Sequence, residues 1–199
     1  MKVILVNGSP REKGCTYTAL CEVAGALEKN GIETEIFQVG AKPIAGCIGC
    51  NACLKNGRCF VDDPVNEFVE KAKTADGFVF GSPVHYAAAS GAITSFLDRA
   101  FYGKGNVFAG KPGAAVVSCR RGGAASAFDQ LNKYFTINSM PVVSSQYWIP
   151  SVSASARRAT PTQRDCRPCA RWAAIWHGCS NVFRQERQRE SHSRSGNLQ

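Results

Sequence analysis

Short apolar runs rich in β-branched residues alternate along the chain with segments whose apolar residues recur at helical spacing. The runs predict buried strands at residues 2–6, 34–39, 77–81 and 114–117, and a fifth strand that begins at 142. Each intervening segment is long enough for the crossover connection that parallel strands require. The pattern therefore predicts an α/β protein with a doubly wound, five-stranded parallel sheet.

Ordinary capping signals mark the ends of the predicted helices. The first helix ends at Asn30, and a later one starts after Asp63, a favourable N-cap that Pro64 follows. Further helices are predicted from about Ser90 and over residues 125–134. Each segment presents one apolar face, as a helix packed on a sheet does.

Four cysteines form a C-x2-C-x2-C-x5-C pattern after the second predicted strand. They are Cys47, Cys50, Cys53 and Cys59. This spacing allows three thiolates to converge from one tight loop while the fourth returns from just beyond it. Soft thiolate sets of this kind bind iron–sulfur clusters or zinc. The pattern predicts metal or cluster binding, with iron–sulfur favoured over zinc; the alternative is a set of small buried apolar side chains or unused thiols.

The loop after the first strand has the chemistry of a phosphate site. Ser9, Thr16 and Thr18 offer hydroxyl groups, and Arg11 offers a guanidinium beside the N-terminus of the first helix. The loop lacks both the G-x-G-x-x-G spacing and the Lys-Ser/Thr ending of a triphosphate loop. These residues predict a monophosphate site; the alternative is a helix start that is merely capped.

Cysteine content and charge raise two further possibilities, namely a secreted disulfide protein and a nucleic-acid-binding protein. The chain has ten cysteines, but no signal-peptide core follows Met1 and no apolar run is long enough to span a membrane. We therefore expect a reducing cytoplasm, in which clustered thiols are ligands rather than disulfides. Nine arginines lie in residues 149–199, so the net charge of +9 belongs largely to a tail of foreign composition. We expect neither nucleic-acid nor membrane partners.

Several separated motifs occur in the order that one protein family shows. They are G-S-P-R and G-C-T within residues 8–16, G-S-P-V-H-Y at 81–86, F-L-D-R at 96–99 and R-R-G-G at 120–123. In these motifs the chain resembles the NADPH-dependent FMN reductase family, and its cysteine pattern is similar to that of the iron–sulfur flavoproteins in this group. The resemblance implies a flavodoxin-like FMN-binding domain over residues 1–148, with strand order 2-1-3-4-5 and a cysteine cluster loop at 47–59.

The resemblance also implies which residues hold the cofactors. The FMN site would comprise Ser9, Arg11, Cys15, Thr16, Thr18, Pro83, Val84, His85, Tyr86 and Cys119. The first loop would hold the FMN phosphate, the second would line the isoalloxazine ring, and Cys119 would lie on the third. The four patterned cysteines would hold a [4Fe–4S] cluster. No side chain is expected to be a catalytic acid or nucleophile, because flavin N5 performs the hydride chemistry.

The expected function is that of an FMN-dependent oxidoreductase, which takes electrons from NAD(P)H and relays them through a [4Fe–4S] cluster. One alternative is an electron-transfer carrier without its own substrate, and another is a zinc-binding module that uses the same cysteines. The chain has no separate nicotinamide motif, so the electron donor and acceptor, whether small molecules or redox proteins, stay open. The resemblance implies a homo-oligomer for intact family members.

After Trp148 the resemblance stops abruptly. Cys and Trp codons both begin with TG, so reading one nucleotide earlier turns each into NTG, which encodes Leu, Met or Val. Five residues would become apolar at the spacing of an amphipathic helix face, namely Cys166, Cys169, Trp172, Trp176 and Cys179. We therefore predict that one nucleotide was lost near codon 149, that the final helix of the fold is lost, and that residues 149–199 form a disordered or poorly packed tail.

Overall fold

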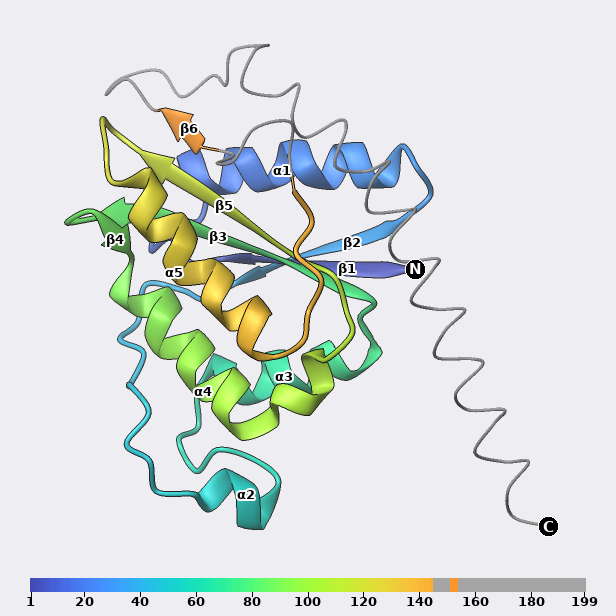
Figure 1. Ribbon diagram of the computed structural model, residues 1–199, viewed down its shortest axis with the longest axis vertical. Coiled ribbons are helices and arrows are strands. Elements are labelled where there is room, and N and C mark those ends of the chain that lie inside the picture. The colour runs from blue at the N-terminus through green and yellow to red at the C-terminus, as the bar shows by residue number, and fades with distance from the viewer. Residues whose placement is uncertain (145–150, 154–199) are drawn as a thin grey trace.

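The computed structural model describes residues 1–144 and 151–153. Figure 1 shows a twisted sheet in the middle of the molecule, with helices on both of its faces. In the described part of the chain the sheet has the order β2-β1-β3-β5-β6, and all neighbours on this path are parallel. Its strands are β1 (Lys2–Asn7), β2 (Glu33–Gln38), β3 (Gly77–His85), β5 (Gly113–Cys119) and β6 (Ser151–Ser153).

A short additional strand, β4 (Ala88–Ala89), was not predicted from the sequence. It pairs antiparallel with the end of β3 and lies off the main path of the sheet. Without β4 the strands follow the order 2-1-3-4-5, so the predicted flavodoxin-like topology is confirmed.

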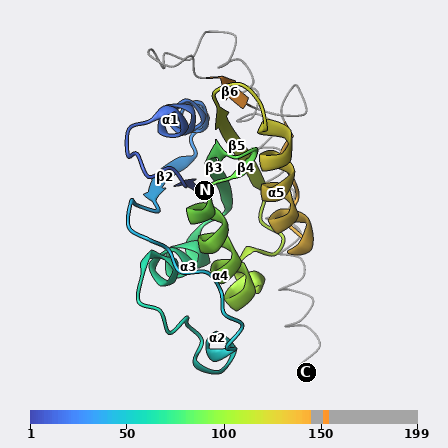
Figure 2. The same cartoon turned by 90° about the vertical axis from the view of Figure 1, so that its left-hand side faces the viewer.

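The helices form two layers, which Figure 2 shows on opposite sides of the sheet. Helix α1 packs on one face, and α3, α4 and α5 pack on the other. Helix α2 lies apart from the sheet, inside the cysteine loop. The bounds are α1 (Cys15–Glu28), α2 (Ala52–Asn56), α3 (Pro64–Thr74), α4 (Gly91–Phe108) and α5 (Ala124–Ile137).

Alternate side chains of the central strands enter two separate apolar cores. Val3 and Leu5 of β1 pack with α1, whereas Ile4 and Val6 face α3, α4 and α5. A cluster of aromatic rings fills the second core, and its members are Phe37, Phe68, Phe78, Phe80, Phe96, Phe101, Phe108 and Phe135. Because helices cover both faces, these strands are apolar throughout rather than alternating.

Two helix starts agree with the capping signals in the sequence. The Asp63 carboxylate accepts a hydrogen bond from the Val65 amide at 3.1 Å, at the start of α3. The Ser90 hydroxyl accepts one from the Ile93 amide at 3.4 Å, at the start of α4. The N-cap predicted at Asp63 and the helix start predicted at about Ser90 are confirmed.

The fifth strand position differs in detail from the sequence prediction. Val142 forms only an isolated bridge with Gly113, and the paired strand is β6, whose residues lie beside Val117–Cys119. The prediction relied on apolar side chains at 142–143, whereas main-chain pairing at β6 involves a serine-rich sequence. The structure therefore places three residues of the segment predicted to be altered in the sheet.

Residues 145–150 and 154–199 lie outside the described residues. The predicted frame change near codon 149, and the remainder of the predicted tail, fall there. None of the helices that the structure describes is long and apolar enough to cross a lipid bilayer.

Candidate functional site

A cavity of about 490 Å³ lies beyond the carboxyl ends of β1, β3 and β5. Its lining residues are Ser9, Pro10, Arg11, Gly14, Cys15, Thr16, Pro83, His85, Ser118, Cys119 and Arg120. The chain leaves β1 towards α1 on one face of the sheet and leaves β3 towards α4 on the other. This is the switch point at which doubly wound sheets bind ligands.

The loop after β1 has its shape fixed by two side chains that the sequence analysis did not identify. The Asn7 side-chain oxygen accepts a hydrogen bond from the Ser9 amide at 3.1 Å, and its nitrogen donates to the Gln38 side-chain oxygen at 2.6 Å. Gln38 in turn donates to the Ser9 carbonyl at 2.7 Å. Asn7 is fully buried, so these bonds hold the loop in a low-dielectric setting. Its only sequence signal was a polar residue at the end of an apolar strand.

The hydroxyl groups predicted to bind phosphate have different surroundings. Ser9 and Thr16 both line the cavity, and the Thr16 hydroxyl also shares a 2.7 Å hydrogen bond with Ser118. The Thr18 hydroxyl donates to the Gly14 carbonyl at 3.2 Å, and Thr18 is not among the lining residues. Arg11 lines the cavity as predicted.

Helix α1 begins without a side-chain cap. Its N-cap residue is Gly14, no side chain accepts a hydrogen bond there, and the first turn contains no acidic residue. The first amide groups of a helix lack intrahelical partners and carry a partial positive charge. The start of α1 can therefore donate hydrogen bonds to an anion in the cavity.

Two glycines allow the first and second loops to approach each other. A Cβ atom at Gly8 would lie 2.6 Å from the Ile93 side chain and 2.8 Å from the Gly81 carbonyl oxygen. A Cβ atom at Gly81 would lie 2.8 Å from Leu20. The Ser90 hydroxyl donates to the Gly8 carbonyl at 2.9 Å, which ties the loop to the start of α4. A larger residue at Gly8 would push the first loop away from the Gly81 carbonyl and α4, whereas one at Gly81 would press on side chains of α1.

The segment predicted to line the flavin ring is divided between two environments. Pro83 and His85 line the cavity, whereas Val84 packs against the core formed with α3, α4 and α5. Tyr86 is fully exposed at the tip of the β3–β4 hairpin and is not among the lining residues. Tyr86 and Ala87 both have positive φ, at 46° and 59°, as a two-residue hairpin turn of the primed type requires.

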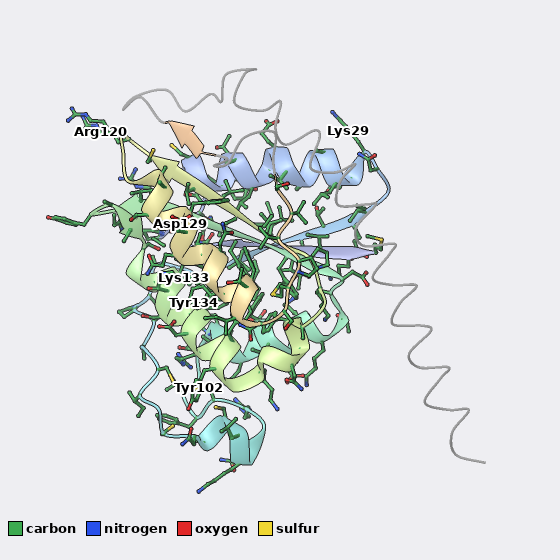
Figure 3. The ribbon with its side chains drawn as sticks, in the orientation of Figure 1. Lys29, Tyr102, Arg120, Asp129, Lys133 and Tyr134 are labelled. Carbon is green, nitrogen blue, oxygen red and sulfur yellow. The ribbon has the colours of Figure 1, made fainter. Side chains whose placement is uncertain are left out.

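The third loop contributes the end of β5. Cys119 is buried and lines the cavity together with the half-buried Cys15. Arg120 follows and also lines the cavity; Figure 3 shows its side chain extending outward from the end of the sheet. Thus seven of the ten predicted FMN-site residues line this cavity, and the other three, Thr18, Val84 and Tyr86, do not.

The cysteine loop leaves β2 at the same end of the sheet and runs past α4 to α2, as Figure 1 shows. All four patterned cysteines line a second cavity, of about 140 Å³. Its lining residues are Ala45, Gly46, Cys47, Ile48, Cys50, Asn51, Ala52, Cys53, Cys59, Phe60, Val61, Arg99 and Tyr102. In the described ranges, no three His, Cys, Asp or Glu side chains are arranged so that they could hold a single metal ion.

Arg99 of α4 is the main polar partner of this cysteine loop. Its Nε and Nη2 groups donate to the Cys59 sulfur at 3.4 and 3.2 Å, and it forms an ion pair with Asp63. It also donates to the carbonyls of Ala45 and Val61, each at 3.3 Å. Burial acts to lower the pKa of Arg99, but the bonds to Asp63 and Cys59 outweigh it and raise that pKa, so the guanidinium stays charged.

Other residues position the backbone and packing of the cysteines. Asn66 accepts a hydrogen bond from the Cys59 amide and donates to the Cys59 carbonyl, both at 3.0 Å. A Cβ atom at Gly103 of α4 would lie 3.3 Å from the Cys53 sulfur, so glycine permits close packing there. Tyr102, which Figure 3 shows facing the α2 region, donates to the Asn51 side chain at 3.0 Å. No local sequence pattern pointed to Asn66, Tyr102 or Gly103, and Arg99 was noted only as part of the motif at 96–99.

Comparisons with known proteins identify the family to which the chain is similar. Residues 1–154 match the family model described as NADPH-dependent FMN reductase. An iron–sulfur flavoprotein of Methanocaldococcus jannaschii is 38% identical over 146 residues, which cover 72% of this chain and 76% of that protein. An iron–sulfur flavoprotein of Archaeoglobus fulgidus is 33% identical over 150 residues, covering 71% and 75% of the two chains.

Solved structures support the fold alone. The crystal structure of RosB with bound 8-demethyl-8-formylriboflavin-5'-phosphate superimposes with a TM-score of 0.68 at 16% identity. The match covers 98% of this chain and 86% of the RosB chain.

Proposed function

Because the chain belongs to the NADPH-dependent FMN reductase family, we propose that it binds FMN in the cavity beyond β1, β3 and β5 and oxidises NAD(P)H. One observation carries this proposal. The loop after β1 is fixed by Asn7 and Gln38 beside the uncapped start of α1, and this arrangement supports a phosphate site that would be preorganised for its ligand. Such preorganisation lowers the ordering cost of binding.

The phosphate of FMN would lie against the first loop. Ser9 and Thr16 present hydroxyl groups, Arg11 presents a guanidinium, and α1 presents its free amides. Charge-assisted hydrogen bonds from these groups suit a dianionic monophosphate. A nucleotide triphosphate would need a lysine in this loop, and the only one, Lys13, is not among the cavity lining residues.

The isoalloxazine ring would lie towards the second and third loops. Pro83, His85 and Cys119 line that part of the wall, and Tyr86 stands beside it on the exposed hairpin tip. Bound FMN would supply the hydride-accepting N5 atom, so the protein needs only to bind and orient the flavin and its donor.

We propose further that the cysteine cavity holds a [4Fe–4S] cluster for electron transfer. The donor set fits this group, because four soft thiols line one small cavity and a buried guanidinium faces one of them. A single zinc ion needs its ligands around one point, and the described residues offer no such set. A four-iron cluster instead takes each thiolate at a different iron, which allows wider spacing.

A flavin titration tests the phosphate site. We expect Arg11→Ala to weaken FMN binding by about 10- to 100-fold, as loss of a charge-assisted hydrogen bond does, while riboflavin binding changes little. Flavin fluorescence quenching measures both affinities. Arg121→Ala serves as the matched control, since Arg121 is exposed and does not line the cavity. Equal losses for FMN and riboflavin would show that the phosphate lies elsewhere.

Anaerobic reduction and metal analysis separate the enzyme from its alternatives. Rapid bleaching of flavin absorbance by NADPH is expected for the enzyme, whereas a carrier would be reduced only by a redox protein. Iron and sulfide assays after anaerobic reconstitution should each give about four equivalents per chain for a [4Fe–4S] cluster. Zinc at one equivalent without sulfide would support the zinc-binding module instead.

A further inference from the structure

We propose that Arg99 is a positioning residue that raises the reduction potential of the cluster by donating two N–H groups to the sulfur of Cys59. This inference rests on the proposed [4Fe–4S] site and adds a role that the cysteine pattern does not contain. Arg99 comes from α4, 40 residues beyond Cys59 in the chain.

The guanidinium of Arg99 is held in one orientation. Its side chain is only 2% exposed, and Asp63 accepts from Nη1 and, at 3.0 Å, from Nη2. The Ala45 and Val61 carbonyls accept further bonds. Rotation of the planar group away from Cys59 would break several of these bonds at once, so its N–H groups stay directed at the sulfur.

One-electron reduction adds a single negative charge to the cluster and its thiolate ligands. Hydrogen bonds to a ligand sulfur stabilise the more negative state more than the oxidised one, and this preference raises the potential. Burial strengthens the effect, because the N–H groups of Arg99 act in a region of low dielectric. Asp63 neutralises much of the net charge of Arg99. The raised potential is therefore attributed to the two N–H groups directed at the Cys59 sulfur, and not to the positive charge of Arg99 acting through space.

A matched pair of substitutions isolates this role. Arg99→Lys keeps the positive charge but removes the planar guanidinium, whose Nε and Nη2 groups both donate to the Cys59 sulfur. Arg58→Lys is the control, because Arg58 lies in the same loop, is exposed, and pairs only with Asp62 at 3.4 Å among the interactions described. Both variants are prepared as the full chain, reconstituted anaerobically with FMN and cluster, and assayed for iron and sulfide.

The measurement is a potentiometric titration with dithionite as the one-electron reductant, followed by electron paramagnetic resonance of the reduced cluster. We expect Arg99→Lys to shift the cluster midpoint to a more negative potential while the flavin midpoint and the Arg58→Lys variant stay at wild-type values. An unchanged cluster midpoint in Arg99→Lys with full iron content would overturn the inference and leave the proposed function intact. Absence of a cluster in the wild-type chain would overturn both.

A second measurement uses the wild-type chain, in case Arg99→Lys does not retain a cluster. Incorporation of ¹⁵N-arginine should produce a nitrogen coupling in the electron–nuclear double resonance spectrum of the reduced cluster. The same coupling should persist in labelled Arg58→Lys. Its absence from the labelled wild-type protein would contradict the assigned hydrogen bonds.

Discussion

At the scale of single residues, the clearest feature is the polar clamp formed by Asn7 and Gln38. It joins the ends of two neighbouring strands, which the register pairs directly, to the main chain at Ser9. Each bond is local in space, yet Asn7 and Gln38 are 31 residues apart in the chain. The clamp therefore determines the geometry of the first loop without contacting the proposed phosphate through its own side chains.

Substitutions at Gln38 test the clamp. We expect Gln38→Ala to weaken FMN binding by about tenfold, since it removes two hydrogen bonds of roughly 1 kcal/mol each and part of that loss reaches the ligand. Gln38→Glu keeps an acceptor for Asn7 but loses the donor to the Ser9 carbonyl, so its affinity should be intermediate. Fluorescence titration with FMN and riboflavin gives the comparison. Wild-type FMN affinity in Gln38→Ala would show that the loop holds its shape without the clamp.

The limits of sequence reasoning are clear at the same scale. Ser9, Arg11 and Thr16 were identifiable because a strand, a polar loop and a helix start follow each other directly in the chain. Gln38 and Arg99 act on residues 29 and 40 positions away, and no local pattern encodes such a pairing. The motif at 81–86 predicted that Tyr86 lines the isoalloxazine ring. The hairpin turn at Tyr86 and Ala87 instead leaves Tyr86 outside the cavity lining.

At the scale of elements, Glu35 of β2 links three of them. Its carboxylate lies 2.7 Å from the amines of both Lys2 on β1 and Lys71 on α3. The hydrogen bonds from Lys2 and then Lys71 lower the pKa of Glu35, against the opposing effect of burial. The carboxylate therefore holds an edge strand to the strand and helix beside it.

The pH dependence of stability follows from this lowered pKa. The stabilisation is complete above the ordinary pKa of a glutamate and is lost as the pH falls through the lower folded-state value. We expect Glu35→Gln to reduce the free energy of unfolding by about 0.5–1.5 kcal/mol at pH 7, with the difference disappearing in acid. Urea unfolding at several pH values measures this. Glu67→Gln is the control, since Glu67 is exposed and 3.9 Å from Lys71; an equal loss in both variants would contradict the assignment.

At the scale of the whole molecule, the described helices cover the two sheet faces unequally. Helices α3, α4 and α5 pack on one face, while α1 is the described helix on the other. The sequence predicts a final helix for this fold and a lost nucleotide near codon 149. This frame change stays a prediction, and both proposed sites are formed by residues that precede codon 149.

Restoring one nucleotide near codon 149 tests it directly. In that frame five positions become Leu, Met or Val at helical spacing, and each such side chain contributes roughly 1.5–3 kcal/mol when fully buried. We expect the restored chain to melt at least about 5 °C higher, because each kcal/mol raises the melting temperature by roughly 2–4 °C at this chain length. Calorimetry and flavin absorbance provide the measurement. Identical melting temperatures and flavin occupancies in the two chains would reject the lost-nucleotide hypothesis.

Helix α4 contacts both sites along its length. Ser90 at its start bonds the Gly8 carbonyl of the first loop, and Arg99 bonds Cys59 of the cysteine loop. At about 1.5 Å per residue, these two attachments lie roughly 13 Å apart along the helix axis. The helix therefore fixes both the distance between the two attachments and their relative orientation. Inserting one residue between them would turn Arg99 by about 100° relative to Ser90. The length of this segment is consequently under a constraint as strict as the identity of the residues at its ends.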